Sequence, residues 1–193
     1  CEEPLLADRV DHIFEHDAVV PSADLDNKYG FKVDVPEHKF NKGEIYNLSV
    51  VRGTLTEEER FKINDHIVQT IVMLDSLPFP KHLERIPEIA GGHHEKTDGT
   101  GYPKRLTGES MTIPAKIMAI ADVFEALTAA DRPYKMPKTL TASIKIMSFM
   151  VKDAHLDAEL FRLFLESGVY QIYAEKYLQP SQIDEVNIAD YIN

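Results

Sequence analysis

Apolar residues along this chain recur mostly at the three- and four-residue spacing of amphipathic α-helices. The clearest case is the stretch TEEERFKINDHIVQTIVMLDSL, which begins at Thr56. Its apolar stripe consists of Ile63, Ile67, Ile71 and Leu74. Thr56 with Glu59 three positions later forms a capping box, and the prolines of LPFP end the helix. The pattern therefore predicts one long helix from Thr56.

Further helices are predicted in the second half of the chain. They cover about residues 83–94, 113–131, 139–153 and 158–168, and a last short helix begins near Ser181. Pro114 suits a first helical turn, and Asp157 is a suitable N-cap for the helix that follows it. The stretch FKVDV, residues 31–35, alternates apolar and polar residues and predicts one short strand. Because strand patterns are so few, the predicted fold class is all-α.

Residues 1–44 differ from the rest, since they are rich in Pro, Asp, Asn and Gly and have no long helical period. We interpret them as an irregular N-terminal arm that precedes a helical domain of residues 45–193. The first residue is Cys1 rather than Met, which indicates a piece excised from a longer protein.

Composition restricts the class of partner. A net charge of −11 argues against a general binder of DNA, RNA or anionic membranes, although a few local cations could still hold a small phosphate ligand. One cysteine cannot form an internal disulfide, which fits a reducing, cytoplasmic location. No apolar run reaches the roughly 20 residues of a membrane span, so we expect no membrane insertion by this chain.

Candidate chemistry centres on His66, His93, His94 and Asp122. Asp122 lies in a helical stripe of small residues, which favours close approach of another backbone and burial of the carboxylate. The members of this stripe are Ala115, Ala119, Ala126 and Ala129. A buried carboxylate needs a cation or several hydrogen bonds, so either an ordinary ion pair or a metal site fits. A lone histidine in the position of His66 is more often a hydrogen-bonded core or boundary residue than a metal ligand.

The segment HHEKTDGTGYP begins at His93, directly after two glycines that weaken the helix. Imidazoles with a carboxylate suit Fe, Mn or Zn, and a pair of such metals can activate water against a phosphodiester. Glu95 and Asp98 either orient the imidazoles or lie at the surface. Arg132 and Lys135, in DRPYK, either contact phosphate or are ordinary solvated charges.

These segments resemble the HD-GYP family of HD-domain phosphohydrolases. HHEKTDGTGYP matches its HHE and DGxGYP hallmark, and IADVFEALTAADRPYK and GTLTEEERFKINDH resemble two further family segments, so that the resemblance covers about residues 36–165. It implies an all-helical bundle of the HD-domain type that hydrolyses cyclic di-GMP in bacterial signalling with two or three metals, usually Fe or Mn. By position it implies the metal ligands His66, His93, His94 and Asp122 and the substrate contacts Tyr102, Pro103, Arg132 and Lys135.

One motif departs from the family pattern, which expects HDIGKIGIPD upstream of His66. The best match is HKFNKGEIYN, where His38 fits a metal ligand and Lys42 a catalytic lysine, but Lys39 replaces the aspartate that bridges the metals. His16 and Asp17 form a literal HD pair, but they lie too far upstream. Two hypotheses follow: a cyclic di-GMP phosphodiesterase, or a degenerate module with fewer metals or none. The module would bind nucleotide or a partner signalling protein without turnover.

Overall fold

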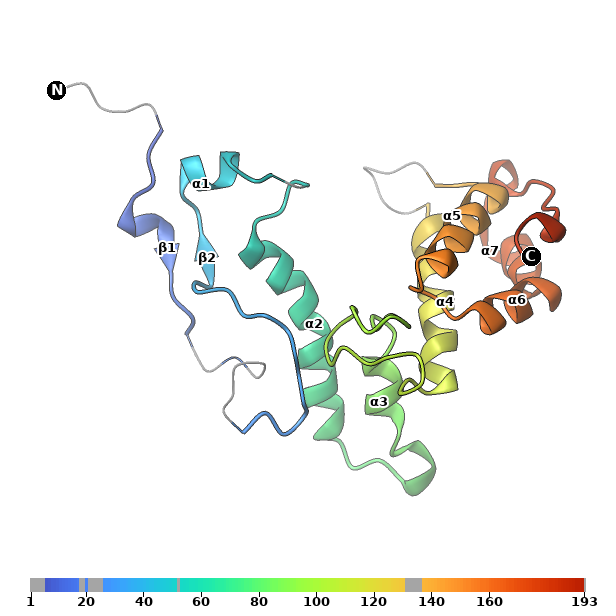
Figure 1. The fold of residues 1–193 in the computed structure, drawn as a ribbon, viewed down its shortest axis with the longest axis horizontal. Helices are drawn as coiled ribbons and strands as arrows, with labels where there is room; N and C mark the ends of the chain where they lie inside the picture. The colour runs from blue at the N-terminus through green and yellow to red at the C-terminus, as the bar shows by residue number, and fades with distance from the viewer. Residues whose placement is uncertain (1–5, 18–19, 21–25, 52, 131–136, 193) are drawn as a thin grey trace. The chain divides into compact units, whose positions relative to one another are not determined.

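The computed structural model describes residues 6–17, 20, 26–51, 53–130 and 137–192. The chain forms two compact units, Cys1–Pro78 and Phe79–Asn193, and the predicted boundary at residue 44 lies inside the first (Figure 1). Most regular structure in the described residues is helical, and the strands among these residues form one two-stranded sheet. This confirms the predicted all-α fold class. Over the same residues, no helix has both the length and the apolar character that crossing a bilayer requires.

The first unit contains a short sheet and one long helix. Its elements are the 3-10 turn η1 (Val10–His12), β1 (Ile13–Phe14), β2 (Phe40–Asn41), α1 (Glu44–Leu48) and α2 (Glu57–Asp75). The strands pair antiparallel, with Phe14 opposite Phe40. The predicted capping box is confirmed: the Glu59 N–H donates to the Thr56 hydroxyl at 3.3 Å, and the Thr56 N–H donates to the Glu59 carboxylate at 3.0 Å.

Helix α2 buries one face against the preceding loop. Ile67 and Ile71 are buried as predicted, whereas Ile63 is 52% exposed, so the apolar stripe begins one turn later than expected. Val68 and Ile71 pack with Phe31 in one apolar cluster. This cluster fixes the orientation of α2 within its unit.

The strand predicted at residues 31–35 does not form. The Asn27 side chain accepts the Phe31 N–H and donates to the Phe31 carbonyl, both at 2.8 Å. These local bonds satisfy the backbone groups of Phe31 that a ladder would otherwise use. The alternating pattern therefore comes from Phe31 and Val33 packing on α2 rather than from strand pairing.

The second unit is a helical bundle around α4 (Figure 1). Its elements are η3 (Lys81–Leu83), α3 (Ile86–Gly91), α4 (Ile113–Thr128), α5 (Leu140–Lys152), α6 (Ala158–Glu166), α7 (Val169–Tyr177), η4 (Pro180–Gln182) and η5 (Ile188–Asp190). Helix α4 contacts α3, α5 and α6, and Phe124 lies in the apolar core that α4 shares with α5, α6 and α7. The predicted N-cap of α6 is confirmed, since the Asp157 carboxylate accepts the Leu160 N–H at 3.1 Å.

Three details of this unit differ from the sequence prediction. Helix α3 ends at Gly91, before the predicted end at His94. Helix α7 was not predicted, because only Tyr170 and Ala174 of its residues are buried and its apolar period is weak. Near Ser181 the chain forms the 3-10 turn η4 instead of an α-helix.

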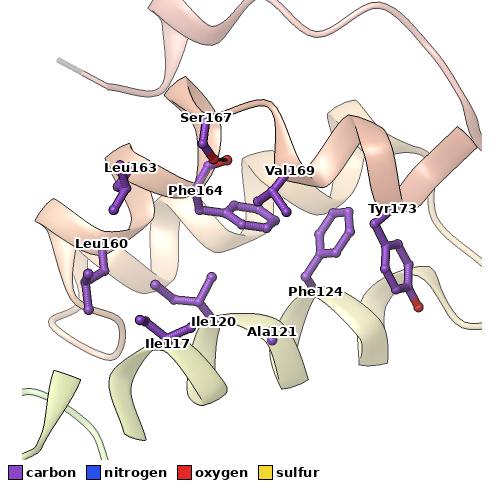
Figure 2. Close-up of a pocket in the computed structure, with 10 residues that line it drawn as sticks. All are labelled: Ile117, Ile120, Ala121, Phe124, Leu160, Leu163, Phe164, Ser167, Val169 and Tyr173. Atoms are coloured by element: carbon purple, nitrogen blue, oxygen red, sulfur yellow. Dashed lines mark hydrogen bonds between the residues drawn. The ribbon is translucent and has the colours of Figure 1, made fainter. Parts of the chain in front are cut away.

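Helices α4, α6 and α7 line an apolar pocket of about 500 Å³ (Figure 2). Phe124 and Tyr173 meet edge to face on one side of it, with ring centroids 5.6 Å apart. The residues that line the pocket include no carboxylate and no imidazole. The pocket is therefore separate from the predicted chemistry.

Candidate metal centre

The end of α3 lies directly against α4. Gly92 caps α3, and a Cβ atom at this position would come 2.8 Å from the Cβ of Ala115. Ala115 is buried, so neither residue has room for a larger side chain. The small-residue stripe of α4 therefore permits the close backbone approach that the sequence predicts. This contact holds the next two residues, His93 and His94, beside α4.

His93 and His94 offer two imidazoles at one place. Their ring centroids are 4.2 Å apart, and one ligand nitrogen from each ring lies within 4.8 Å of the other. Both side chains are half-buried. Because the residues follow the helix rather than continue it, adjacent positions can present their rings to the same region.

A backbone carbonyl sets the tautomer of His93. Its Nδ1 lies 2.7 Å from the carbonyl oxygen of Ala90. A carbonyl can only accept, so Nδ1 carries the proton and Nε2 keeps its lone pair. Metal-binding histidines usually have this arrangement, in which the second ring nitrogen is held by a carbonyl or a carboxylate. His93 thus fits a metal ligand through Nε2.

Tyr102 covers one side of the histidine pair. Its ring stacks on His94 with centroids 4.9 Å apart and planes 19° apart, and its N–H donates to the His94 carbonyl at 3.2 Å. Burial raises the pKa of the Tyr102 hydroxyl, and the negative charge of Asp122 raises that pKa further. Like an ordinary tyrosine, this residue is protonated at neutral pH, and its hydroxyl can donate a hydrogen bond.

Asp122 on α4 is exposed, so the predicted burial of this carboxylate is wrong. The buried face of α4 centres on Ile120, Phe124 and Thr128, and Asp122 projects away from it. Its charge acts on Tyr102, which places the carboxylate near the loop that carries the histidine pair. Asp122 is thus accessible to a ligand in the same unit as His93 and His94.

His66 lies on α2 in the first unit and is exposed. Its Nδ1 contacts the carbonyl oxygen of Ile63, one turn earlier, so Nε2 again keeps its lone pair. His66 and His93 therefore share the same tautomer for the same reason. The convergence of His66 with the histidine pair stays a prediction.

Residues 1–160 match the sequence model of the HD domain. This chain belongs to the HD domain family. Together with that match, the HHEKTDGTGYP segment puts the chain in the HD-GYP branch.

Several curated relatives match parts of this HD-GYP chain. It is 41% identical over 136 residues to a probable cyclic di-GMP phosphodiesterase of Vibrio cholerae, covering 67% of this chain and 30% of the relative. It is 37% identical over 116 residues to 3′3′-cGAMP-specific phosphodiesterase 1 of Vibrio cholerae, covering 60% of this chain and 26% of the relative. A cyclic di-GMP phosphodiesterase of Pseudomonas aeruginosa is 36% identical over 102 residues, covering 52% and 24%. The chain thus spans under a third of the length of these relatives.

The segment that best matches the HD motif begins at His38 and includes β2, which pairs with β1. The Nδ1 atom of His38 lies 3.3 Å from a carboxylate oxygen of Glu15, and the ammonium of Lys42 lies 4.9 Å from the centroid of the Phe14 ring. Both predicted site residues are therefore engaged by the arm that carries β1. Their roles as ligand and catalytic residue stay predictions.

Lys39 forms an ion pair with Asp17. The hydrogen bond from Lys39 and the charge of its ammonium hold the pKa of the Asp17 carboxyl below its usual value. Asp17 of the literal HD pair is thus the partner of the lysine that we expect to replace the family aspartate. Spacing alone gave no sign of this, because 22 residues separate them.

The four predicted substrate contacts have different outcomes. Arg132 and Lys135 lie outside the described residues. The side chain of Pro103 is fully buried, and its role as a substrate contact stays a prediction. Tyr102 is half-buried and remains the accessible member of the GYP segment.

Glu95 and Asp98 hold backbone groups. Glu95 is 1% exposed, and its carboxylate accepts the N–H groups of Lys104 at 2.6 Å and Leu106 at 2.8 Å. Asp98 is exposed and accepts the Thr100 N–H at 2.8 Å. The burial of Glu95 was not predicted, and the turn-forming glycines that follow it were the available signal in the sequence. Burial raises the pKa of Glu95, although the backbone hydrogen bonds oppose the rise.

Proposed function

We propose that this chain is the HD-GYP part of a metal-dependent phosphodiesterase that hydrolyses a cyclic dinucleotide, cyclic di-GMP or a close analogue. One observation carries the proposal: the ring of Tyr102 stacks on His94, whose ring lies beside that of His93, and the charge of Asp122 raises the pKa of the Tyr102 hydroxyl. The relatives named as cyclic di-GMP and 3′3′-cGAMP phosphodiesterases support this substrate class. A cytoplasmic location fits such a signal molecule.

The donor set suits a divalent cation such as Fe or Mn. We expect His66, His93, His94 and Asp122 to hold it, with His38 as a further ligand. Imidazole and carboxylate are the ligands that these metals accept. When bound, such a cation lowers the pKa of coordinated water and neutralises charge on a phosphate. The carbonyl of Ala90 keeps Nε2 of His93 available for this role.

Hydrolysis adds water across one phosphodiester of the ring. A bond forms between the water oxygen and phosphorus, the bond from phosphorus to the leaving oxygen breaks, and that oxygen takes up a proton. Tyr102 would contribute a hydrogen bond from its hydroxyl, which is protonated at neutral pH, to a phosphate oxygen. Arg132 and Lys135 would neutralise further negative charge on the phosphates.

A second candidate function is a module that binds a cyclic dinucleotide or a partner signalling protein without turnover. The observation that favours it is the Lys39–Asp17 ion pair. A lysine at the family's bridging position brings a positive charge where a cation needs a carboxylate. The paired Asp17 offsets that charge but is itself committed to the ammonium.

The test is hydrolysis by the purified chain after anaerobic loading with Fe²⁺ or Mn²⁺. Cyclic di-GMP and 3′3′-cGAMP are supplied separately, and products are separated by chromatography. We expect linear dinucleotide from at least one substrate, and loss of both metal and product in Asp122→Ala. Glu125→Ala, an exposed carboxylate on the same helix, is the matched control and should keep both. Binding of a dinucleotide without any product would support the second candidate instead.

A further inference from the structure

The loop of residues 101–106 wraps around the backbone and side chain of one buried residue, Glu95. On one side, a Cβ atom at Gly101 would come 2.3 Å from the backbone nitrogen of Lys96 and 2.5 Å from the Cα of Glu95. Only a glycine can approach that closely. The loop backbone therefore lies directly on the backbone of the HHE segment.

On the other side, backbone amides of the loop bind the Glu95 carboxylate. One of its oxygens accepts the Lys104 N–H at 2.6 Å, and the other accepts the Leu106 N–H at 2.8 Å. Arg105, between them, has a positive φ of 56°. Successive N–H groups around a left-handed residue form a concave anion site called a nest. Here the anion is a side chain of the protein itself.

Tyr102 lies between these two attachments in the sequence. Gly101, just before it, packs against the backbone of Glu95, and Lys104, two residues after it, donates its N–H to the Glu95 carboxylate. Tyr102 stacks on His94, the immediate neighbour of Glu95. Glu95 therefore contacts the loop that carries Tyr102 and is also the sequence neighbour of His94, on which the Tyr102 ring stacks.

We propose that Glu95 is a positioning residue, whose carboxylate holds the loop so that the Tyr102 ring stays stacked on His94. The effect of Glu95 on ligand binding rests on the proposed function, whereas its effect on the position of the Tyr102 ring does not. Because Glu95 is buried, a substitution that removes one of its acceptor oxygens leaves a loop N–H without a partner, which raises the free energy of the folded state. Glu95→Gln keeps the size of the side chain but turns one acceptor into a donor that faces an N–H group.

The first experiment does not depend on activity. In Glu95→Gln, we expect the amides of Lys104 and Leu106 to exchange hydrogen at least about tenfold faster, as loss of a hydrogen bond to a charged group implies. The ring resonances of Tyr102, assigned in protein with labelled tyrosine, should shift as the stack on His94 loosens. Glu109→Gln, an exposed carboxylate shortly after the loop, should change neither signal. Unchanged Tyr102 resonances in Glu95→Gln would overturn the proposal.

The second experiment separates positioning from general support of the fold. We expect Glu95→Gln to raise the KM for the cyclic dinucleotide about tenfold while metal content stays the same. In a Tyr102→Ala background, the same substitution should add little further loss, because Glu95 acts through that ring. Additive losses would refute positioning. If the original chain neither binds nor hydrolyses a cyclic dinucleotide, the proposed function fails, and the exchange and ring signals alone decide the role of Glu95.

If Glu95→Gln does not fold, as judged by circular dichroism, Glu95→Asp carries the same test. It keeps two acceptor oxygens but withdraws them by one methylene. We expect the same Tyr102 resonances to shift in the same direction by a smaller amount. No shift in a folded Glu95→Asp protein would count against the proposal.

Discussion

At the scale of single residues, the tautomer of a histidine decides whether it can bind a cation. The Nδ1–H groups of His66 and His93 each donate a hydrogen bond to the carbonyl three residues earlier, that of Ile63 and of Ala90 respectively. Both keep the Nε2 lone pair that a metal needs. Sequence shows the histidines but not the carbonyls that orient them, since that depends on where each ring lies on its helix or turn.

We therefore predict that His93→Ala loses most of the bound metal while its helices persist. The substitution removes one ligand but leaves the Gly92–Ala115 contact that joins α3 to α4. Metal content by mass spectrometry and helicity by circular dichroism check the two parts. His82→Ala removes an exposed histidine from η3 and should leave metal content unchanged. Full metal content in His93→Ala would remove His93 from the ligand set.

At the scale of elements, Asp157 joins α6 to α4. Its carboxylate caps α6 and also accepts a hydrogen bond from the Lys116 ammonium at 2.9 Å, with both side chains largely buried. Burial alone would raise the pKa of Asp157, but the bonds from Lys116 and Leu160 outweigh it and hold that pKa below its usual value. The ionised carboxylate therefore stabilises the folded state.

We predict that Asp157→Ala lowers the free energy of unfolding by about 1–3 kcal/mol, from loss of the cap and of a partly buried ion pair. A depressed folded-state pKa gives stability that is present above the unfolded pKa and lost as pH falls through the folded value. The difference from the original chain should therefore shrink below about pH 4. Urea unfolding at several pH values measures it.

The control is Glu166→Ala, which breaks the exposed Arg162–Glu166 pair on the same helix. Exposed pairs contribute about 0–1 kcal/mol, so this variant should unfold almost like the original chain. Equal losses in Glu166→Ala and Asp157→Ala would mean that neither the cap nor the burial of the Lys116 pair matters.

Helices α2, α6 and α7 show which parts of the fold could be predicted from the sequence and which could not. The capping box at Thr56 and the cap at Asp157 depend on residues within one turn, and both were predictable. The partner of Asp157 on α4 lies 41 residues away and was not. Helix α7 was missed because its few buried residues give a weak pattern. Of the candidate site, the residue types could be read from the sequence, but the exposure of Asp122 and the burial of Glu95 follow from packing.

At the scale of the whole molecule, charge is the main constraint on the proposed function. The chain carries a net charge of −11, yet the proposed ligand is an anion. Local cations must therefore bring the phosphates in against a repelling field. Lys39 is a poor source of that charge, because Asp17 already pairs with it. Bound metal and the pair Arg132 and Lys135 are the remaining sources that the sequence indicates.

The last prediction uses Lys39 to choose between enzyme and non-hydrolytic module. Lys39→Asp removes the ammonium from Asp17 and places a second carboxylate beside it, and the two negative charges then favour a divalent cation near His38. We expect this variant to bind more Fe or Mn than the original chain, and to hydrolyse cyclic di-GMP faster if the other ligands are in place. Lys39→Ala removes the charge without adding a ligand, so it should gain neither. If the original chain already holds two or more metals and hydrolyses cyclic di-GMP rapidly, Lys39 is no obstacle and the non-hydrolytic module is excluded.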